Sequence, residues 1–84
     1  MTDITDKAAK SRYELVTDGY LSIADYRKDG NNLAITHVEV PHALRSKGIA
    51  ARLMEGVLLD AKNKGLNVIP ICSYAVSYIQ RQGK

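Results

Sequence analysis

The feature that most restricts the fold of this sequence is a strand–helix–strand pattern between residues 33 and 73. Apolar side chains alternate in "LAITHVEV" (33–40), as in a strand that buries one face. Apolar residues then recur at spacings of three and four, which predicts a helix from about Lys47 to Lys64 that Gly65 ends. A short apolar run over residues 68–72 predicts a second buried strand. Such a βαβ unit has parallel strands whose carboxyl ends meet at one edge of the sheet.

Antiparallel strands are predicted before this unit and a helix after it. Residues 12–17 and 20–27 alternate on either side of the pair Asp18-Gly19, which is typical of a tight hairpin turn. Residues 73–82 carry apolar side chains at helical spacing. The predicted fold class is therefore α/β in the broad sense (α+β): antiparallel strands, a βαβ unit and a C-terminal helix, with one mixed sheet. Residues 1–10 show no sustained periodicity, so we expect a flexible N-terminal arm followed by a single domain over residues 11–84.

The alternation over residues 33–40 predicts which side chains share a face of that strand. Leu33, Ile35, His37 and Glu39 are expected on one face, and Ala34, Thr36, Val38 and Val40 on the other. The polar residues come at the carboxyl end, where strands of α/β proteins usually carry functional groups. In the second parallel strand, Pro70 lacks a backbone donor and predicts an edge, a bulge or a local parting of the strands.

Composition narrows the class of protein. A chain of 84 residues buries one modest core, and 45% hydrophobic with 25% charged residues is ordinary for a folded domain. No apolar run approaches the roughly 20 residues that span a bilayer, and the first ten residues lack the apolar core of a secretory signal. We therefore expect a cytoplasmic protein without a membrane partner, and the single cysteine, Cys72, agrees with a reducing compartment. The net charge of +3 is dispersed, and Phe and Trp are absent, which argues against a nucleic-acid partner.

The loop before the predicted helix, within "VPHALRSKGIAARL" (40–53), combines cations with a glycine. The first amides of a helix have no intrahelical partner and carry partial positive charge, so a phosphate is stabilised there. Gly48 would let a ligand approach the backbone closely, Ala50 keeps the next turn narrow, and Arg45 and Lys47 add positive charge. Anion binding is one interpretation of this loop. The other is a helix start that is simply basic and solvated.

The stretch "RSKGIA" (45–50) resembles the R/Q-x-x-G-x-G/A motif of the GCN5-related N-acetyltransferases, and residues 36–79 resemble the small single-domain subgroup sometimes called YidJ-like. The resemblance implies acetyl-CoA as cofactor, with its pyrophosphate on this loop and its pantetheine arm along the backbone of residues 38–40. The thioester would then lie where the two parallel strands part. The residues that the resemblance places against the cofactor are Val38, Val40, Arg45, Ser46, Lys47, Gly48, Ile49, Ala50 and Ser73.

Acetyl transfer to an amine requires an uncharged nitrogen, and a lysine-like amine with a pKa of ~10.4 is neutral about once in 10³ at pH 7. Glu39 is one candidate base, because related enzymes often place a carboxylate at this strand end. His37 is the other, because histidine has an ordinary pKa of ~6.5 and can exchange protons at neutral pH. The alternatives are a solvated acid and a packing histidine. Cys72 is implied by the resemblance as a nucleophile, and its alternative is a buried space-filling residue. Tyr74 and Tyr78, which could protonate a departing thiolate, are assigned to packing, and no metal site is expected.

We therefore expect an acetyl-CoA-dependent N-acetyltransferase whose acceptor is an unidentified amine of a small molecule or a peptide. The acetyl group would pass directly or through a cysteine thioester. The alternative is a non-catalytic module that binds coenzyme A. Larger members of the family build their acceptor site from strands after the second helix, and this sequence contains no such strands, so the resemblance does not define the acceptor. An exposed sheet edge can pair with a second copy, so we expect a monomer or a weak homodimer.

Overall fold

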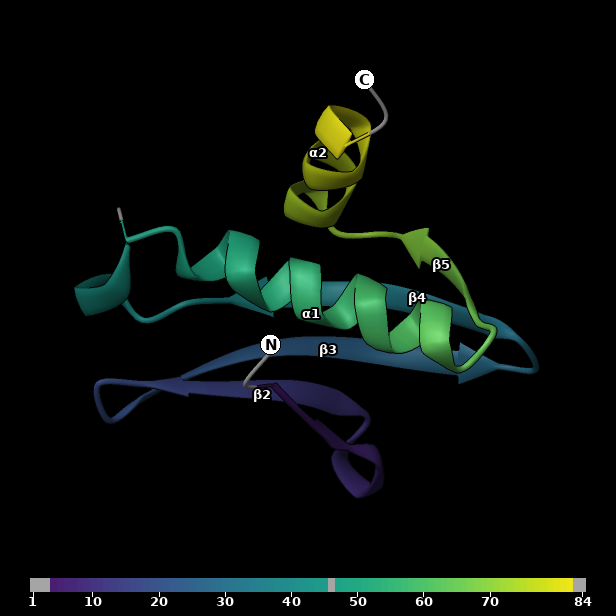
Figure 1. Cartoon of the computed structure of the whole chain (residues 1–84), viewed down its shortest axis with the longest axis horizontal. Helices are drawn as coiled ribbons and strands as arrows, with labels where there is room; N and C mark the ends of the chain where they lie inside the picture. Colours follow the sequence, from purple (N-terminus) through teal and green to yellow (C-terminus); the bar gives the residue numbers. More distant parts are fainter. Residues whose placement is uncertain (1–3, 46, 83–84) are drawn as a thin grey trace.

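The computed structural model describes residues 4–45 and 47–82 and has an α+β architecture (Figure 1). Within these residues, one sheet has the strand order β1-β2-β3-β4-β5, and its neighbours are antiparallel except β4 and β5, which are parallel. The strands are β1 (Thr5–Lys7), β2 (Arg12–Thr17), β3 (Tyr20–Asp29), β4 (Asn32–Glu39) and β5 (Asn67–Pro70). The helices are α1 (Ile49–Asn63) and α2 (Ser73–Gln82), with short 3₁₀ helices η1 (Ala8–Lys10) and η2 (His42–Leu44). The predicted fold class is confirmed, including the βαβ unit and the C-terminal helix.

The turns follow the backbone chemistry that the sequence predicts. Asp18 and Gly19 have φ values of 52° and 81°, as a two-residue hairpin turn of the primed type requires, and they join β2 to β3. Gly65 has a φ of 70° just after α1, the left-handed conformation that ends many helices. At its other end α1 begins at Ile49, two residues later than predicted, because Gly48 takes the left-handed conformation and forms the N-cap.

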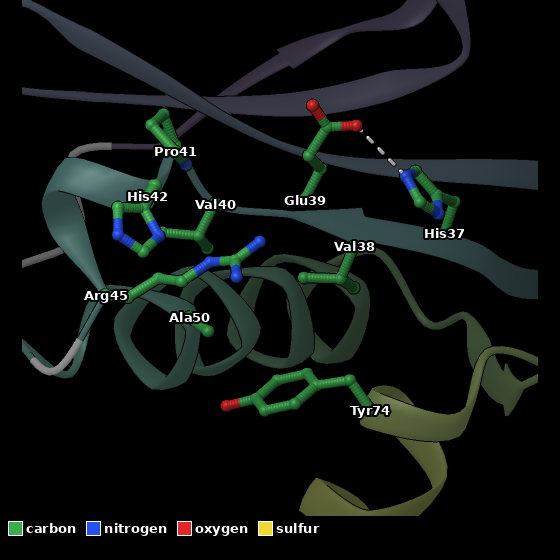
Figure 2. A pocket seen from close by; sticks show the side chains of 9 residues that line it. All are labelled: His37, Val38, Glu39, Val40, Pro41, His42, Arg45, Ala50 and Tyr74. Carbon is green, nitrogen blue, oxygen red and sulfur yellow. Dashed lines mark hydrogen bonds and ion pairs between the residues drawn. The ribbon is translucent and has the colours of Figure 1, made fainter.

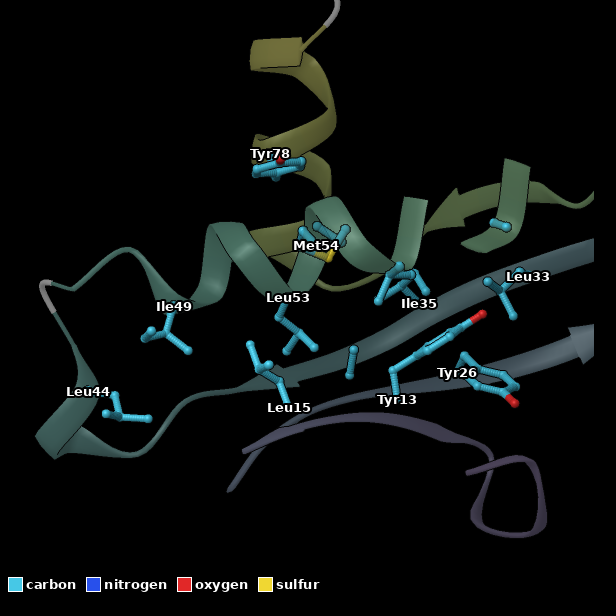
Figure 3. Close-up of a cluster of buried hydrophobic side chains, with 14 residues drawn as sticks. Tyr13, Leu15, Tyr26, Leu33, Ile35, Leu44, Ile49, Leu53, Met54 and Tyr78 are labelled. Atoms are coloured by element: carbon cyan, nitrogen blue, oxygen red, sulfur yellow. The ribbon is translucent and has the colours of Figure 1, made fainter. Parts of the chain in front are cut away.

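The hydrophobic core lies between α1 and one face of the sheet (Figure 3). Leu53, Met54 and Val57 of α1 are completely buried there, at three- and four-residue spacing. The buried hydrophobic residues are Tyr13, Leu15, Ala24, Tyr26, Leu33, Ile35, Leu44, Ile49, Leu53, Met54, Val57, Ala61, Ala75 and Tyr78. Ala75 and Tyr78 belong to α2, so the second helix shares the same core.

A β-bulge interrupts the pairing of β4 with β3. Ile35 lies opposite Tyr26, and His37 lies opposite Asp25, the preceding residue of β3. Thr36 is therefore an extra residue in β4, and it shifts the alternation of all later side chains by one position.

The bulge decides which side chains near the end of β4 face the core. Leu33 and Ile35 are buried against α1, and beyond the bulge Val38 and Val40 are the residues that pack against the core. His37 and Glu39 point to the opposite face of the sheet (Figure 2). The prediction that His37 and Glu39 share a face with Leu33 and Ile35 is wrong, because strict alternation presumes a strand without a bulge.

The N-terminal segment is part of the sheet. Residues of β1 pair with β2, and Ile4 packs against Gly56 of α1, where an added Cβ would lie 2.9 Å from Cγ2 of Ile4. Residues 4–10, part of the segment expected to be a flexible arm, thus contain β1 and η1, while residues 1–3 lie outside the described part of the chain. A strand of three residues, Thr5–Lys7, is too short to produce a periodicity that sequence reasoning could detect.

A polar network ties this segment to the end of α1. The hydroxyl of Tyr26 donates to Oδ1 of Asp6 (2.6 Å), and Nζ of Lys64 donates to Oδ2 of Asp6 (2.9 Å). The same Nζ lies 2.9 Å from Oδ2 of Asp60, which accepts a hydrogen bond from the hydroxyl of Tyr13 (2.8 Å). Four elements or their ends, β1, β2, β3 and α1, are thus joined by charge-assisted hydrogen bonds.

The network shifts the pKa of most of its members. Burial and the hydrogen bond to Asp6 raise the pKa of Tyr26 to about 12, and burial with the hydrogen bond to Asp60 raises the pKa of Tyr13. Hydrogen bonds to Asp60 and Asp6 raise the pKa of Lys64. For Asp6 desolvation is the largest single influence and opposes ionisation, but the hydrogen bonds from Tyr26 and Lys64 and the nearby positive charge together lower its pKa.

The lowered pKa of Asp6 predicts an acid-sensitive contribution to stability. The carboxylate stabilises the fold fully above the ordinary aspartate pKa of ~3.9, and this contribution is lost as the pH falls through the lower folded-state value. We expect Asp6→Asn to lower the free energy of unfolding by about 1 kcal/mol at pH 7, and by much less at pH 2.5. Chemical denaturation at both pH values measures this difference. An equal loss at the two pH values would contradict an ionic role for Asp6.

Ser22 of β3 provides a second stability test. Its side chain is fully buried, and its Oγ has no hydrogen-bond partner within the described residues. A buried hydroxyl without a partner costs free energy, so we expect Ser22→Ala to stabilise the fold by about 1 kcal/mol and to raise Tm by a few degrees. Differential scanning calorimetry measures the shift. A clear drop in Tm would mean that Ser22 has a partner in solution, such as a buried water.

Candidate functional site

The site is built where β4 and β5 part. Their parallel ladder ends with Ile35 opposite Pro70, and the amides of Ile71 and Cys72 both donate to the carbonyl oxygen of Ile35, at 3.0 Å and 3.1 Å. Proline has no N–H with which to continue a ladder, and the chain then leaves the sheet to begin α2. The edge of β4 beyond Ile35 therefore has no strand beside it among the described residues. Of the three alternatives predicted from Pro70, the structure shows two, since β5 is an edge strand and it parts from β4 at Pro70.

A pocket of about 550 Å³ occupies this opening (Figure 2). It is lined by His37, Val38, Glu39, Val40, Pro41, His42, Arg45, Ala50 and Tyr74. A second pocket of about 240 Å³ shares Val40, Arg45, Ala50 and Tyr74 with the first and continues along Leu44, Gly48, Ile49 and Ala51. The two pockets form one groove, which runs from the amino end of α1, along β4, to His37 and Glu39.

The amino end of α1 lacks a side-chain cap. Gly48 is the N-cap with a φ of 71°, so the N-cap residue supplies no side-chain hydrogen bond to the first amides, and the first turn contains no acidic residue. A Cβ at Gly48 would meet nothing within 4 Å, so the backbone conformation, rather than space, requires glycine here. The first-turn N–H groups are left to water or to a ligand, and the helix dipole favours an anion.

One of the two predicted cations reaches the groove. Arg45 lines both pockets, and its guanidinium extends over the start of α1 between Val40 and Ala50 in Figure 2. Lys47 lines neither pocket, and its Nζ lies 3.8 Å from Oδ2 of Asp18 in the β2–β3 hairpin. Ser46 lies outside the described residues, so its predicted role has no structural description.

His37 and Glu39 form a pair at the far end of the groove. Nε2 of His37 lies 3.2 Å from Oε1 of Glu39, and the side chains are 55% and 67% exposed. Both residues line the larger pocket. A histidine held by a carboxylate at the mouth of a groove can accept a proton from a bound molecule and release it to water.

Cys72 occupies the N-cap position of α2. Its Sγ accepts a hydrogen bond from the amide of Ala75 at 3.4 Å, and the residue is half-buried. Cys72 and Ser73, which begins α2, line neither of the two pockets. The structure thus separates these two predicted site residues from the groove wall that holds the others.

Tyr74 packs against the core, as the sequence predicts, but it also lines the groove, which was not predicted. It lines both pockets, with its side chain extending from the first turn of α2 below Ala50, whereas Tyr78 is buried in the core as predicted (Figure 2). The helical spacing of the two tyrosines indicates a shared side of α2 but does not indicate which one lies at the groove. The position of Tyr74 directly after the parallel strand was the available signal.

The described part of the chain contains neither a metal-binding cluster nor a membrane-spanning helix. No group of three or more His, Cys, Asp and Glu side chains is arranged to hold a metal ion among residues 4–45 and 47–82. No described helix is long and apolar enough to cross a membrane.

A known protein family matches the part of the sequence that contains the groove. The sequence model of a family described as GCN5-related N-acetyl-transferase matches residues 12–84. The chain belongs to the GCN5-related N-acetyltransferase family. A search of curated proteins found no relative of this family member. The matched residues include the whole groove, from β4 through α1 to Tyr74.

The ion pair between Lys47 and Asp18 predicts an effect on anion binding by this acetyltransferase family member. Asp18 places a negative charge beside the loop that starts α1, so Asp18→Asn should tighten the binding of an anion at the start of α1, such as inorganic pyrophosphate, about twofold at low salt. Isothermal titration calorimetry measures this change. Asp29→Asn, an exposed aspartate in the other hairpin, is the matched control and should leave the affinity unchanged. Equal effects of the two substitutions would contradict the prediction.

Proposed function

We propose that this protein is an acetyl-CoA-dependent N-acetyltransferase of the small single-domain, YidJ-like kind, which acetylates an amine. The observation that carries the proposal is the continuous groove from the uncapped amino end of α1, through the parted strands, to the pair of His37 and Glu39. Membership of an acetyltransferase family supports it, since its members generally use acetyl-CoA. Acetyl-CoA would supply an acetyl group activated as a thioester.

The residues of the groove suit the parts of that molecule. The first amides of α1, from Gly48 to Ala51, and the guanidinium of Arg45 offer hydrogen bonds and positive charge to a pyrophosphate. The open edge of β4 at Val38, continued by Val40 just after the strand, offers backbone donors and acceptors to the amide groups of a pantetheine arm. These side chains pack against the core, so the apolar side of the groove is rigid.

The pair of His37 and Glu39 is the proposed proton acceptor. Deprotonating a lysine-like amine at pH 7 costs about 4.6 kcal/mol, so a base beside the acceptor is needed. In our proposal the imidazole of His37 takes the proton, and Glu39 orients the ring and stabilises its positive charge. Their exposure allows the proton to pass on to water.

A route through Cys72 is a second candidate mechanism, favoured by the hydrogen bond from the amide of Ala75 to Sγ. This contact fixes the sulfur at the start of α2, next to Tyr74 of the groove. The sulfur would take the acetyl group, its proton would go to the released coenzyme A, and the amine would then displace the cysteine thiol. Tyr74 lines the groove and is two residues after Cys72 in the sequence. Its hydroxyl is the proposed proton donor to the departing thiolate of coenzyme A.

Gly48→Ala tests the proposed cofactor site. Alanine at a φ of 71° is strained, so the start of α1 should shift and coenzyme A should bind about tenfold more weakly or worse. Gly65→Ala is a matched control, because Gly65 has a φ of 70° and equally open space at the other end of α1. Both variants should lose about 1 kcal/mol of stability, but calorimetric titration should show weaker binding only for Gly48→Ala. Unchanged affinity in Gly48→Ala would reject the site.

Cys72→Ala distinguishes the two routes. If acetyl transfer passes through sulfur, incubation with acetyl-CoA alone should add one acetyl group to the wild type and none to Cys72→Ala, as measured by intact-protein mass spectrometry. Transfer to an amine should then fall at least 10²-fold in the variant. An unmodified wild type that acetylates amines would support direct transfer, with His37 and Glu39 as base. A wild type that binds coenzyme A but acetylates neither itself nor any amine would support the non-catalytic binding module.

A further inference from the structure

The face of the sheet opposite α1 is open. Here we call the outer face the side chains of β2, β3 and β4 that point away from α1 next to the groove mouth: Arg12, Glu14, Val16, Leu21, Ile23, Asp25, His37 and Glu39. Arg27 continues this face along β3. Val16 and Leu21 are 63% and 42% exposed, so no described element packs over them. Large aliphatic side chains paired directly across two strands form an apolar surface that favours contact with another molecule.

The apolar part of the outer face adjoins the mouth of the groove. Glu39, which lines the larger pocket, lies directly opposite Ile23, and Val16 lies directly opposite Leu21. Leu21 is two residues before Ile23 in β3, on the same face, so about 7 Å separates them along the strand. Ile23 and Leu21 therefore form an apolar path that leads away from the pair of His37 and Glu39 and is about as long as a six-carbon chain.

The charges beside this path are mainly negative. Glu39, Asp25 and Glu14 are carboxylates of the outer face. Of the two arginines on the same face, Arg12 lies opposite Asp25 and donates through Nε to Glu14 at 3.1 Å, and Arg27 follows Asp25 on β3, farther from Ile23 and Leu21. Asp25 lies directly opposite His37. A protonated amine is therefore attracted to the groove mouth, while its hydrocarbon part can cover Ile23 and Leu21.

We infer that the outer face is the acceptor site and that the acceptor is a cationic primary amine carried on an apolar chain or ring. The amine lies at the groove mouth between Glu39 and Asp25, beside His37, and the apolar part lies over Ile23, Leu21 and Val16. This assignment of the substrate class rests on the proposed acetyl transfer. A second copy of the chain is the less suitable occupant, because it would cover Glu39 and close the groove mouth that the reaction requires open.

Binding of n-hexylamine to the full chain tests the inference without the cofactor. The methyl resonances of Val16, Leu21 and Ile23 should shift with hexylamine, and Leu21→Ser should weaken the binding about fivefold. Leu59→Ser is the matched control, since Leu59 is a comparably exposed leucine (47%) of α1 on the other layer, and it should leave the affinity unchanged. The spectra also report whether each variant is folded. Methylamine and n-hexanol, which lack the chain or the charge, should each bind more weakly than hexylamine.

Four results would overturn the inference. The first is that hexylamine does not shift the resonances of the outer face, and the second is that Leu21→Ser and Leu59→Ser weaken binding equally. The third is that hexanol or methylamine binds as tightly as hexylamine. The fourth is that the outer-face resonances shift with protein concentration alone, which would indicate a dimer. Titration with coenzyme A in the same sample tests the proposed function separately, through the amides of Ile49 and Ala50. Coenzyme A binding without hexylamine binding would reject only the acceptor site. Hexylamine binding without coenzyme A binding would reject the proposed function and leave the outer face as an amine-binding site with no acetyl transfer.

Discussion

The early end of the ladder between β4 and β5 is the constraint on which the rest of the site depends. The strands share only the pairs from Asn32 with Asn67 to Ile35 with Pro70. Pro70 supplies no N–H, and the carbonyl of Ile35 accepts from both Ile71 and Cys72, so the chain turns away into α2. A full-length ladder would close the edge of β4 with backbone hydrogen bonds. Because the ladder stops, the groove can contain both an open strand edge and the start of α1.

The bulge at Thr36 gives the groove two chemically different sides. It turns Val38 and Val40 toward α1 and the core, and it turns His37 and Glu39 toward the outer face. Without it, the acid and the imidazole would be directed at the apolar core, where desolvation would oppose their charge. One extra residue therefore places an anion-binding helix start and a proton-accepting pair on opposite sides of the same strand edge.

The sequence was sufficient to predict those elements that local backbone chemistry determines. The Asp18-Gly19 turn and the helix pattern after Ile49 follow from backbone chemistry and were predicted, and the parting at Pro70 was one of three predicted alternatives. The bulge was missed because nothing in residues 33–40 distinguishes an extra residue from regular alternation. Strand β1 was missed because three residues show no period, and its stability comes from distant partners such as Lys64 and Gly56.

Within the candidate site, some residues could be placed from the local sequence and others depend on tertiary contacts. Gly48 and Arg45 could be placed from the motif and the helix start, and both lie at the groove. Lys47 could not, because its partner Asp18 belongs to a hairpin about thirty residues away in the sequence, and only tertiary packing brings the two together. For Tyr74 the helical pattern was correct, but its exposure to the groove depends on how α2 leaves β5.

The central claim is that the open edge of β4 and the start of α1 bind one coenzyme A molecule together. Amide hydrogen exchange with and without saturating coenzyme A tests it most directly, residue by residue. The account predicts slower exchange at residues 38–40 and at residues 49–51 in the same titration, with the β2–β3 hairpin unchanged. Coenzyme A binding that protects neither segment, or only one of them, would contradict it.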